Sequence, residues 1–199
     1  MKLANKITLL RIVLAPILFL IFFIPLIRSQ WAVVSVFIMV PLLIIAELTD
    51  FFDGYYARKR GEVSSFGKLF DPFGDVILHF TLFICLTLTG AVHPLVLALI
   101  FYREFSMNFV RLLAIEKGVA IGAGKGGKFK TLFYIVTIFY FLLFESLRRL
   151  DVTIPEVPVL PIIATLLNIG CVITAYSSFI SYLVHFRTLI TGKHSGRPQ

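Results

Sequence analysis

Long apolar runs constrain this chain more than any other feature of its sequence. Stretches of about 20 largely apolar residues, the length that a helix needs to cross the hydrocarbon of a bilayer, occur six times. Backbone N–H and C=O groups find no water inside lipid, so each run must satisfy them internally as a helix. The sequence therefore predicts an all-α membrane bundle of six transmembrane helices in a single domain, residues 1–199, with spans near residues 7–27, 31–50, 72–90, 94–115, 130–147 and 159–186.

The composition agrees with residence in a membrane. Hydrophobic residues make up 58% of the chain and charged residues only 15%, whereas about a quarter of the residues of an ordinary soluble domain are charged. The mean hydropathy is +0.93. These values exclude a soluble globular domain.

The basic residues are distributed unevenly between the two sides of the predicted bundle. Six spans place both termini on the same side, and fourteen lysines and arginines fall there, against Arg28, Arg148 and Arg149 on the other side. Basic residues concentrate on the cytoplasmic side of membrane proteins. We therefore expect the protein to lie in the inner (cytoplasmic) cell membrane, with both termini facing the cytoplasm. Topology and anionic lipid headgroups explain the net charge of +8, so no nucleic-acid partner is expected.

Four aspartates stand at the expected cytoplasmic edge of the second and third spans. Asp50 and Asp53 are three residues apart, and Asp71 and Asp75 are four apart, so each pair lies on one face of a helix. A single D-x-x-D at a helix end is ordinarily a solvated cap. Four carboxylates packed together repel one another, and they can be protonated, paired with basic residues or bound to cations.

Two such pairs around one turn favour bound cations. Two divalent ions would neutralise four carboxylates, and oxygen ligands without His or Cys favour Mg²⁺, Mn²⁺ or Ca²⁺. A two-metal site of this kind suits displacement at phosphorus. Small residues accompany the aspartates: Gly54 and Ala57 continue the face of the first pair, and Gly67 precedes the second. Their lack of bulk would let a flat ligand approach the backbone.

Residues 50 to 75 resemble the signature of the CDP-alcohol phosphatidyltransferase family, D-x2-D-G-x2-A-R-x8-G-x3-D-x3-D, with every gap of the required length. The resemblance implies a six-helix membrane enzyme, expected to be a homodimer, that moves the phosphatidyl group of CDP-diacylglycerol to an alcohol and releases CMP. It implies two Mg²⁺ or Mn²⁺ ions held by Asp50, Asp53, Asp71 and Asp75, with Asp75 also accepting the proton of the attacking hydroxyl. It further implies that CDP-diacylglycerol is bound by Asp53, Gly54, Ala57, Arg58 and Gly67.

Two further stretches, residues 5–19 and 103–131, resemble the bacterial phosphatidylglycerophosphate synthases of that family, which implies sn-glycerol 3-phosphate as the acceptor. Two positions depart from that pattern, Gly74 in place of Ala and Val76 in place of Lys. A phosphate needs cationic or hydrogen-bonding partners, and the candidates are Asn5, Thr8, Arg11, Arg103, Arg111, Lys128 and Lys130.

The reasons for choosing these residues as candidates for binding the acceptor phosphate differ. Asn5, Thr8 and Arg11 recur at three-residue spacing on one helical face. Arg103 and Arg111 lie in an apolar span, where an intramembrane charge is by default functional, although Arg103 can instead pair with Glu104. Lys128 and Lys130 can equally be membrane anchors.

Several alternatives stay open at the level of sequence. Within the family, the acceptor can be inositol phosphate, serine or phosphatidylglycerol. Outside it, an intramembrane prenyltransferase with aspartate-rich motifs and a divalent-cation transporter also use intramembrane carboxylates. His79, in the third span, is expected to be a hydrogen-bonded core residue rather than a metal ligand.

Overall fold

The computed structural model describes residues 3–60, 67–116, 125–153 and 157–193, and within these it does not describe the side chains of residues 3–6, 50–60, 67–69, 125 and 188–193. The described chain forms six α-helices and a short 3₁₀ turn, and the same residues contain no strand, which confirms the predicted all-α class. The elements are α1 (Leu3–Ile27), η1 (Ser29–Trp31), α2 (Ala32–Arg60), α3 (Gly67–Leu88), α4 (Pro94–Glu116), α5 (Lys125–Arg149) and α6 (Val159–Lys193).

Several helices extend beyond the predicted spans. The second span was predicted to end at residue 50, but α2 continues to Arg60, so Asp50 and Asp53 lie inside a helix rather than at its end. The fifth span was predicted to begin near residue 130, yet α5 already begins at Lys125. Hydropathy detects only the part of a helix that lies in hydrocarbon, whereas the helix itself continues into the headgroup region.

Five described helices are long and apolar enough to cross a membrane, with mean hydropathies between 1.4 and 2.7 over their spans. The fourth predicted span corresponds to α4, which is 23 residues long but carries Arg103, Glu104 and Arg111. Arg103 and Glu104 are buried inside the bundle. Charged residues in membrane helices are tolerated in this position, facing the interior and one another.

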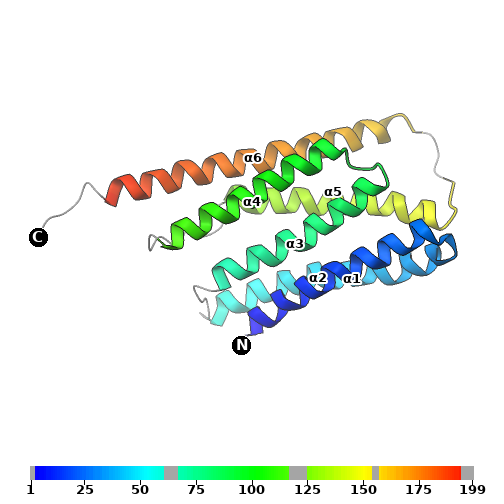
Figure 1. The fold of residues 1–199 in the computed structure, drawn as a ribbon, viewed down its shortest axis with the longest axis horizontal. Coiled ribbons are helices and arrows are strands. Elements are labelled where there is room, and N and C mark those ends of the chain that lie inside the picture. Colours follow the sequence, from blue (N-terminus) through cyan, green and yellow to red (C-terminus); the bar gives the residue numbers. More distant parts are fainter. Residues whose placement is uncertain (1–2, 61–66, 117–124, 154–156, 194–199) are drawn as a thin grey trace, which may run out of the picture.

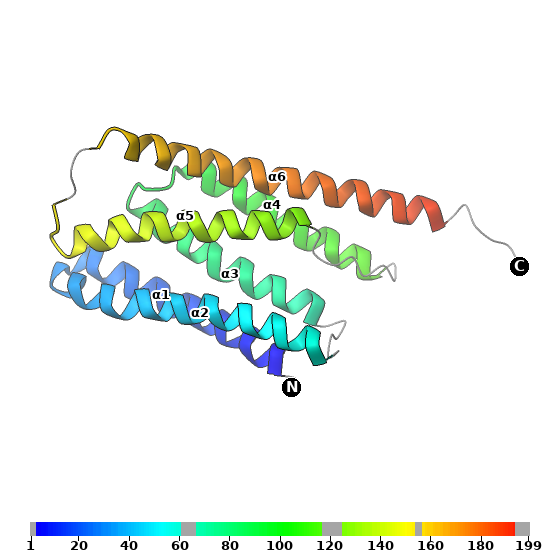
Figure 2. The same ribbon diagram turned by 180° about the vertical axis from the view of Figure 1, so that it is seen from behind.

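The helices pack around α3, which contacts α1, α4 and α5. On one side α1 packs against both α3 and α2, and on the other α6 packs against α4 and α5 (Figure 1). Seen from behind, α5 lies between α6 and the α1–α2 pair (Figure 2). Fully buried apolar side chains from all six helices fill the centre, among them Leu18, Met39, Leu82, Ile100, Ile138 and Cys171.

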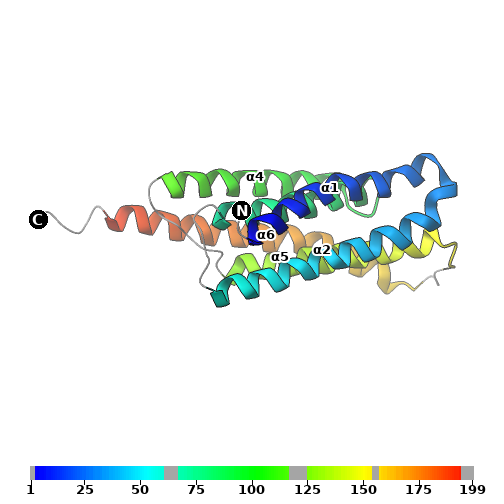
Figure 3. The ribbon, with the colours of Figure 1, turned by 90° about the horizontal axis from the view of Figure 1, so that it is seen from below.

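The two ends of the bundle differ in what they bring together. We call the end at which α2 ends and α3 begins the aspartate end. The start of α1, the end of α4, the start of α5 and the end of α6 also lie there (Figure 1). The last turns of α6 project beyond the other helices at this end (Figure 3). All the sequence-predicted site residues on α2 and α3 therefore lie at the same end as the start of α1 and the end of α6.

The surface and the interior show the pattern expected of a protein in lipid. Large apolar side chains point outward, and Phe37 and Phe105 are each 69% exposed. Several ionic groups are enclosed instead. At the opposite end Arg149, 9% exposed, donates to Glu145 Oε1 at 2.7 Å and to Ser35 Oγ at 2.8 Å. A third bond from Arg149, to the carbonyl of Phe22 at 3.0 Å, ties α5 to α1. This ion-paired cluster joins three helices far from the aspartates.

Candidate functional site

The first part of the site lies where α1 meets the beginning of α3. Thr8 Oγ1 donates a 2.6 Å hydrogen bond to Asp71 Oδ1, and Arg11 forms a salt bridge with Asp75. Thr8 and Arg11 lie on one face of α1, as their spacing predicted, but the structure brings them to the carboxylates of α3. The polar face of α1 is therefore part of the aspartate cluster itself.

The close approach of the two helices depends on Gly74. A Cβ atom at this position would lie 2.7 Å from Thr8 Cγ2 and 3.4 Å from the Thr8 carbonyl oxygen. Carbon atoms that are not bonded to each other do not come so close, so a larger residue would have to displace Thr8. The glycine thus allows α1 to place a hydroxyl on Asp71, one turn from Asp75.

The other half of the predicted metal site is on α2. The backbone of Asp50 and Asp53 is helical within α2, but their side chains lie outside the described part of the structure. The arrangement of all four carboxylates therefore stays a prediction. The same holds for the nucleotide or acceptor contacts predicted for Asn5, Gly54, Ala57, Arg58 and Gly67.

The described carboxylates nevertheless suit a hard divalent cation. Among the side chains that the structure describes, Asp71 accepts from a neutral hydroxyl and Asp75 pairs with one guanidinium, so within this set Arg11 balances one of their two negative charges. Carboxylate oxygens are the ligands that Mg²⁺ and Mn²⁺ prefer, and a bound cation would offset the remaining charge.

A second polar pair lies deeper in the same region. His79 Nε2 forms a 3.0 Å hydrogen bond with Glu47 Oε1, and the His79 side chain is buried. This confirms that His79 is a hydrogen-bonded core residue. The partner could not be predicted from the sequence, because Glu47 lies on another helix, 32 residues away along the chain.

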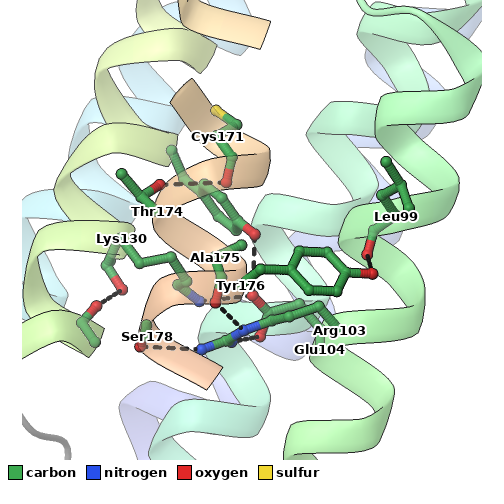
Figure 4. Close-up of polar contacts among 12 residues, drawn as sticks. Leu99, Arg103, Glu104, Lys130, Cys171, Thr174, Ala175, Tyr176 and Ser178 are labelled. Carbon is green, nitrogen blue, oxygen red and sulfur yellow. Dashed lines mark hydrogen bonds and ion pairs between the residues drawn. The ribbon is translucent and has the colours of Figure 1, made fainter. Parts of the chain in front are cut away.

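A cluster of buried charges joins α4, α5 and α6 (Figure 4). Arg103 donates from Nη1 to Glu104 Oε2 at 2.7 Å, from Nε to the carbonyl oxygen of Ala175 at 3.0 Å, and from Nη2 to Ser178 Oγ at 3.2 Å. The predicted ion pair between Arg103 and Glu104 is confirmed. Because three of its five N–H groups are already engaged by α4 and α6, Arg103 has a clear role in holding the helices together.

Lys130 enters the same cluster from α5. Its Nζ donates to Glu104 Oε1 at 2.7 Å and lies 4.6 Å from the centre of the Tyr134 ring. The Tyr134 hydroxyl donates to the same Glu104 oxygen at 3.2 Å. Two cations thus share one carboxylate, which leaves an excess of one positive charge among the described side chains of this buried cluster. Sequence reasoning found Lys130 but missed Tyr134 and Ser178, whose types are common in membrane helices.

The remaining acceptor candidates lie nearer the aspartate end. Arg111 is half-buried on α4, two turns beyond Arg103. Lys128 is exposed near the start of α5. The structure therefore divides the predicted acceptor residues into those on α1 beside the aspartates and those on α4 and α5.

Comparison with known proteins decides which family these features belong to. The profile of the family described as CDP-alcohol phosphatidyltransferase matches residues 1–176, a range that contains every residue predicted for the site. The chain belongs to the CDP-alcohol phosphatidyltransferase family. The match favours phosphatidyl transfer over the prenyltransferase and cation-transporter alternatives.

Curated members of the CDP-alcohol phosphatidyltransferase family resemble the chain over most of its length. A protein of Treponema pallidum is 40% identical over 155 residues, which cover 77% of this chain and 71% of the relative. A protein of Bacillus subtilis is 37% identical over 148 residues, covering 71% and 77%. One from Rickettsia typhi is 38% identical over 133 residues, covering 65% and 70%. All three are named CDP-diacylglycerol–glycerol-3-phosphate 3-phosphatidyltransferase.

Proposed function

We propose that this chain transfers the phosphatidyl group of CDP-diacylglycerol to sn-glycerol 3-phosphate, forming phosphatidylglycerophosphate and CMP. In this reaction the acceptor hydroxyl oxygen bonds to the phosphatidyl phosphorus, and the bond from that phosphorus to the bridging oxygen of CMP breaks. The observation that carries the proposal is the pairing of Thr8 with Asp71 and of Arg11 with Asp75 at one end of a membrane bundle. The shared name of the relatives supports the choice of acceptor.

The residues of the aspartate end take complementary roles in this proposal. Asp75 accepts the proton of the attacking hydroxyl, a task for which a carboxylate at the reacting centre is suited. Arg11 keeps a positive charge beside that carboxylate and orients it, while Thr8 orients Asp71. The small residues Gly54, Ala57 and Gly67, with Asp53 and Arg58, bind the cytidine end of the donor.

We also propose that Asp50, Asp53, Asp71 and Asp75 hold two Mg²⁺ or Mn²⁺ ions. When bound, the ions would supply positive charge to offset that of the donor diphosphate and of the departing CMP. Asp71 and Asp75 support this assignment, because they are two carboxylates that face a single guanidinium among the described side chains.

The acceptor phosphate has its partners on α4 and α5. Glu104 holds Arg103 and Lys130 in fixed positions, and the described side chains of the cluster keep an excess of one positive charge. Arg111 adds a second cation closer to the aspartate end. Intramembrane cations of this kind attract an anionic group, and charge-assisted hydrogen bonds to phosphate are stronger than hydrogen bonds between neutral groups. We assign the direct contact to Arg111 and a supporting contact to Lys130, because Arg103 is committed to α6.

The uneven distribution of basic residues supports an inner-membrane location with the aspartate end in the cytoplasm. CMP would then leave into water while the diacylglycerol tails stay in lipid. A homodimer, as the family resemblance implies, is part of the proposal.

The test measures CMP release by the purified protein in lipid nanodiscs containing CDP-diacylglycerol. We expect release only when Mg²⁺ or Mn²⁺ and sn-glycerol 3-phosphate are both present, and no release after chelation with EDTA. Metal-independent release, or no release with any alcohol acceptor, would overturn the proposal.

A further inference from the structure

The partly buried hydrogen bond between Glu47 and His79 has no role in the chemistry described above. Both side chains lie within helices that are apolar enough to span a membrane, and His79 is 5% exposed. A carboxylate in such surroundings is costly, and groups of this kind are found mainly where they serve a function. The pair therefore needs an explanation beyond core packing.

Its position relative to the aspartates is fixed by helical geometry. Glu47 precedes Asp50 by three residues on α2, and His79 follows Asp75 by four on α3, so each lies on the same helical face as a predicted metal ligand. On each helix, about one turn, or about 5.4 Å along the axis, separates the residue of this pair from the neighbouring aspartate. The bond therefore crosses from α2 to α3 one turn deeper in the bundle than the two aspartate pairs.

The two helices that this bond joins do not pack directly on each other. Among the residues whose positions the structure describes, no Cα atom of α2 lies within 8 Å of one in α3, although α1 packs closely against both. Directly packed helices have axes only about 8–10 Å apart, so their Cα atoms come well within that limit. Packing on α1 holds both helices, and the bond between Glu47 and His79 adds a side-chain link that joins α2 directly to α3.

The α3 side of this bond is itself held in place. The His79 ring meets the edge of the Tyr134 ring, with centroids 6.5 Å apart and planes at 89°. Tyr134 is fully buried and donates its hydroxyl to Glu104. His79 thus rests on the charged cluster of α4, α5 and α6, and the bond to Glu47 fixes α2 against that support.

We propose that Glu47 and His79 are positioning residues that set the distance between the two aspartate pairs, and with it the affinity for divalent metal. The inference rests on the proposed metal site. Neither residue contacts the metal. Their hydrogen bond holds Asp50 and Asp53 of α2 at the separation from Asp71 and Asp75 of α3 at which one pair of ions is shared.

The experiment measures Mn²⁺ binding to purified protein in nanodiscs, without substrates, from the electron paramagnetic resonance signal of free Mn²⁺. Glu47→Leu and His79→Leu should each weaken Mn²⁺ binding by about tenfold, at the lower end of the effect of groups that orient metal ligands from outside. The double variant should bind no more weakly than the worse single variant, because both changes remove the same bond. His79→Gln, which keeps a donor, should restore binding toward the wild-type value.

A matched control is available on the same helix. Ser35→Ala also removes a buried bond between helices, the one from Arg149, but at the opposite end of α2. It should leave Mn²⁺ affinity unchanged, and an equal loss in this variant would show that loosening α2 anywhere suffices, which contradicts the inference. If neither leucine variant folds, the Mn²⁺ affinities of Glu47→Gln and His79→Gln are compared with that of wild type. The inference then requires that Mn²⁺ affinity is kept where the hydrogen bond is kept and falls where the bond is lost.

The outcomes separate this inference from the proposal beneath it. If wild-type protein binds no Mn²⁺, or Asp75→Asn binds as tightly as wild type, the metal site is wrong and the inference fails with it. If wild type binds and Asp75→Asn does not, while the leucine variants bind as wild type does, only the positioning role is overturned.

Discussion

Gly74 lies so close to Thr8 that a methyl group added to its α-carbon would come within 2.7 Å of Thr8 Cγ2. The same threonine donates its hydroxyl to Asp71, so its side chain is not free to rotate without losing that bond. The contact couples the packing of α1 on α3 to the orientation of a predicted metal ligand.

Gly74→Ala should therefore lower activity by displacing Thr8 from Asp71. A hydrogen bond to a charged group contributes roughly 1.5–3 kcal/mol, so we expect kcat/KM to fall at least about tenfold. Thr8→Ser keeps the hydroxyl and lacks the clashing methyl group, so the double variant Gly74→Ala/Thr8→Ser should recover most of the activity. Steady-state rates of the three variants test this, and a double variant as slow as Gly74→Ala would show that the clash is not with that methyl group.

Replacing the predicted metal ligands should abolish turnover without unfolding the bundle. Asn keeps the size of Asp but removes the negative charge, so Asp50→Asn, Asp53→Asn, Asp71→Asn and Asp75→Asn should each lose most activity at any Mg²⁺ concentration. For Asp75, the loss of the proton acceptor alone should cost about 10²- to 10⁴-fold. Thermal unfolding serves as the control for folding. Near-normal rates in two or more of these variants at saturating Mg²⁺ are incompatible with a two-metal site.

Arg111→Gln should affect the acceptor and spare the donor. Loss of a charge-assisted contact to phosphate, worth roughly 1.5–3 kcal/mol, predicts a fall of about ten- to a hundredfold in kcat/KM for sn-glycerol 3-phosphate. Each substrate is titrated with the other saturating. Arg148→Gln is the matched control, because it removes an arginine that is 61% exposed at the opposite end of the bundle. If Arg111→Gln weakened donor binding and left acceptor binding normal, the assignment of Arg111 to the acceptor would be wrong.

Glu145 should matter for stability and not for catalysis. It accepts bonds from buried Arg149 at 2.7 Å and from exposed Arg148 at 2.8 Å. Glu145→Leu leaves Arg149 buried without its carboxylate, which typically costs about 3–5 kcal/mol, whereas Arg148→Gln removes only an exposed partner, worth about 0–1 kcal/mol. Thermal unfolding in nanodiscs should show a clearly lowered midpoint for the first variant alone. Equal midpoints would mean that the cluster does not hold α1, α2 and α5 together.

The sequence predicted the helices well because the surroundings leave little choice. An apolar run in lipid must be helical, so six runs gave six helices, and errors arose only at ends such as Arg60 and Lys125, where the chain leaves hydrocarbon. Helical spacing likewise predicted that Thr8 and Arg11 share a face. Spacing along one helix does not say which helix lies opposite, however, and here the partner of α1 is α3.

Contacts between distant helices account for the rest of what sequence reasoning missed. Glu47 with His79, and Glu104 with Lys130, are pairs 32 and 26 residues apart. Intramembrane charges did identify Arg103 and Glu104 as unusual, because a charge in hydrocarbon needs a partner. The further partners of Arg103 on α6, the carbonyl of Ala175 and the hydroxyl of Ser178, carry no charge, and only the fold brings them to it.

The measurement that tests the central claim most directly is a competition among acceptors. Purified protein in nanodiscs with CDP-diacylglycerol and Mg²⁺ is given sn-glycerol 3-phosphate, inositol phosphate, serine and phosphatidylglycerol together, and the lipid products are identified by mass spectrometry. We predict phosphatidylglycerophosphate as the dominant product, formed in step with CMP and absent in Asp75→Asn. A dominant product from any other acceptor, or phosphatidylglycerophosphate formed equally well by Asp75→Asn, would contradict the account.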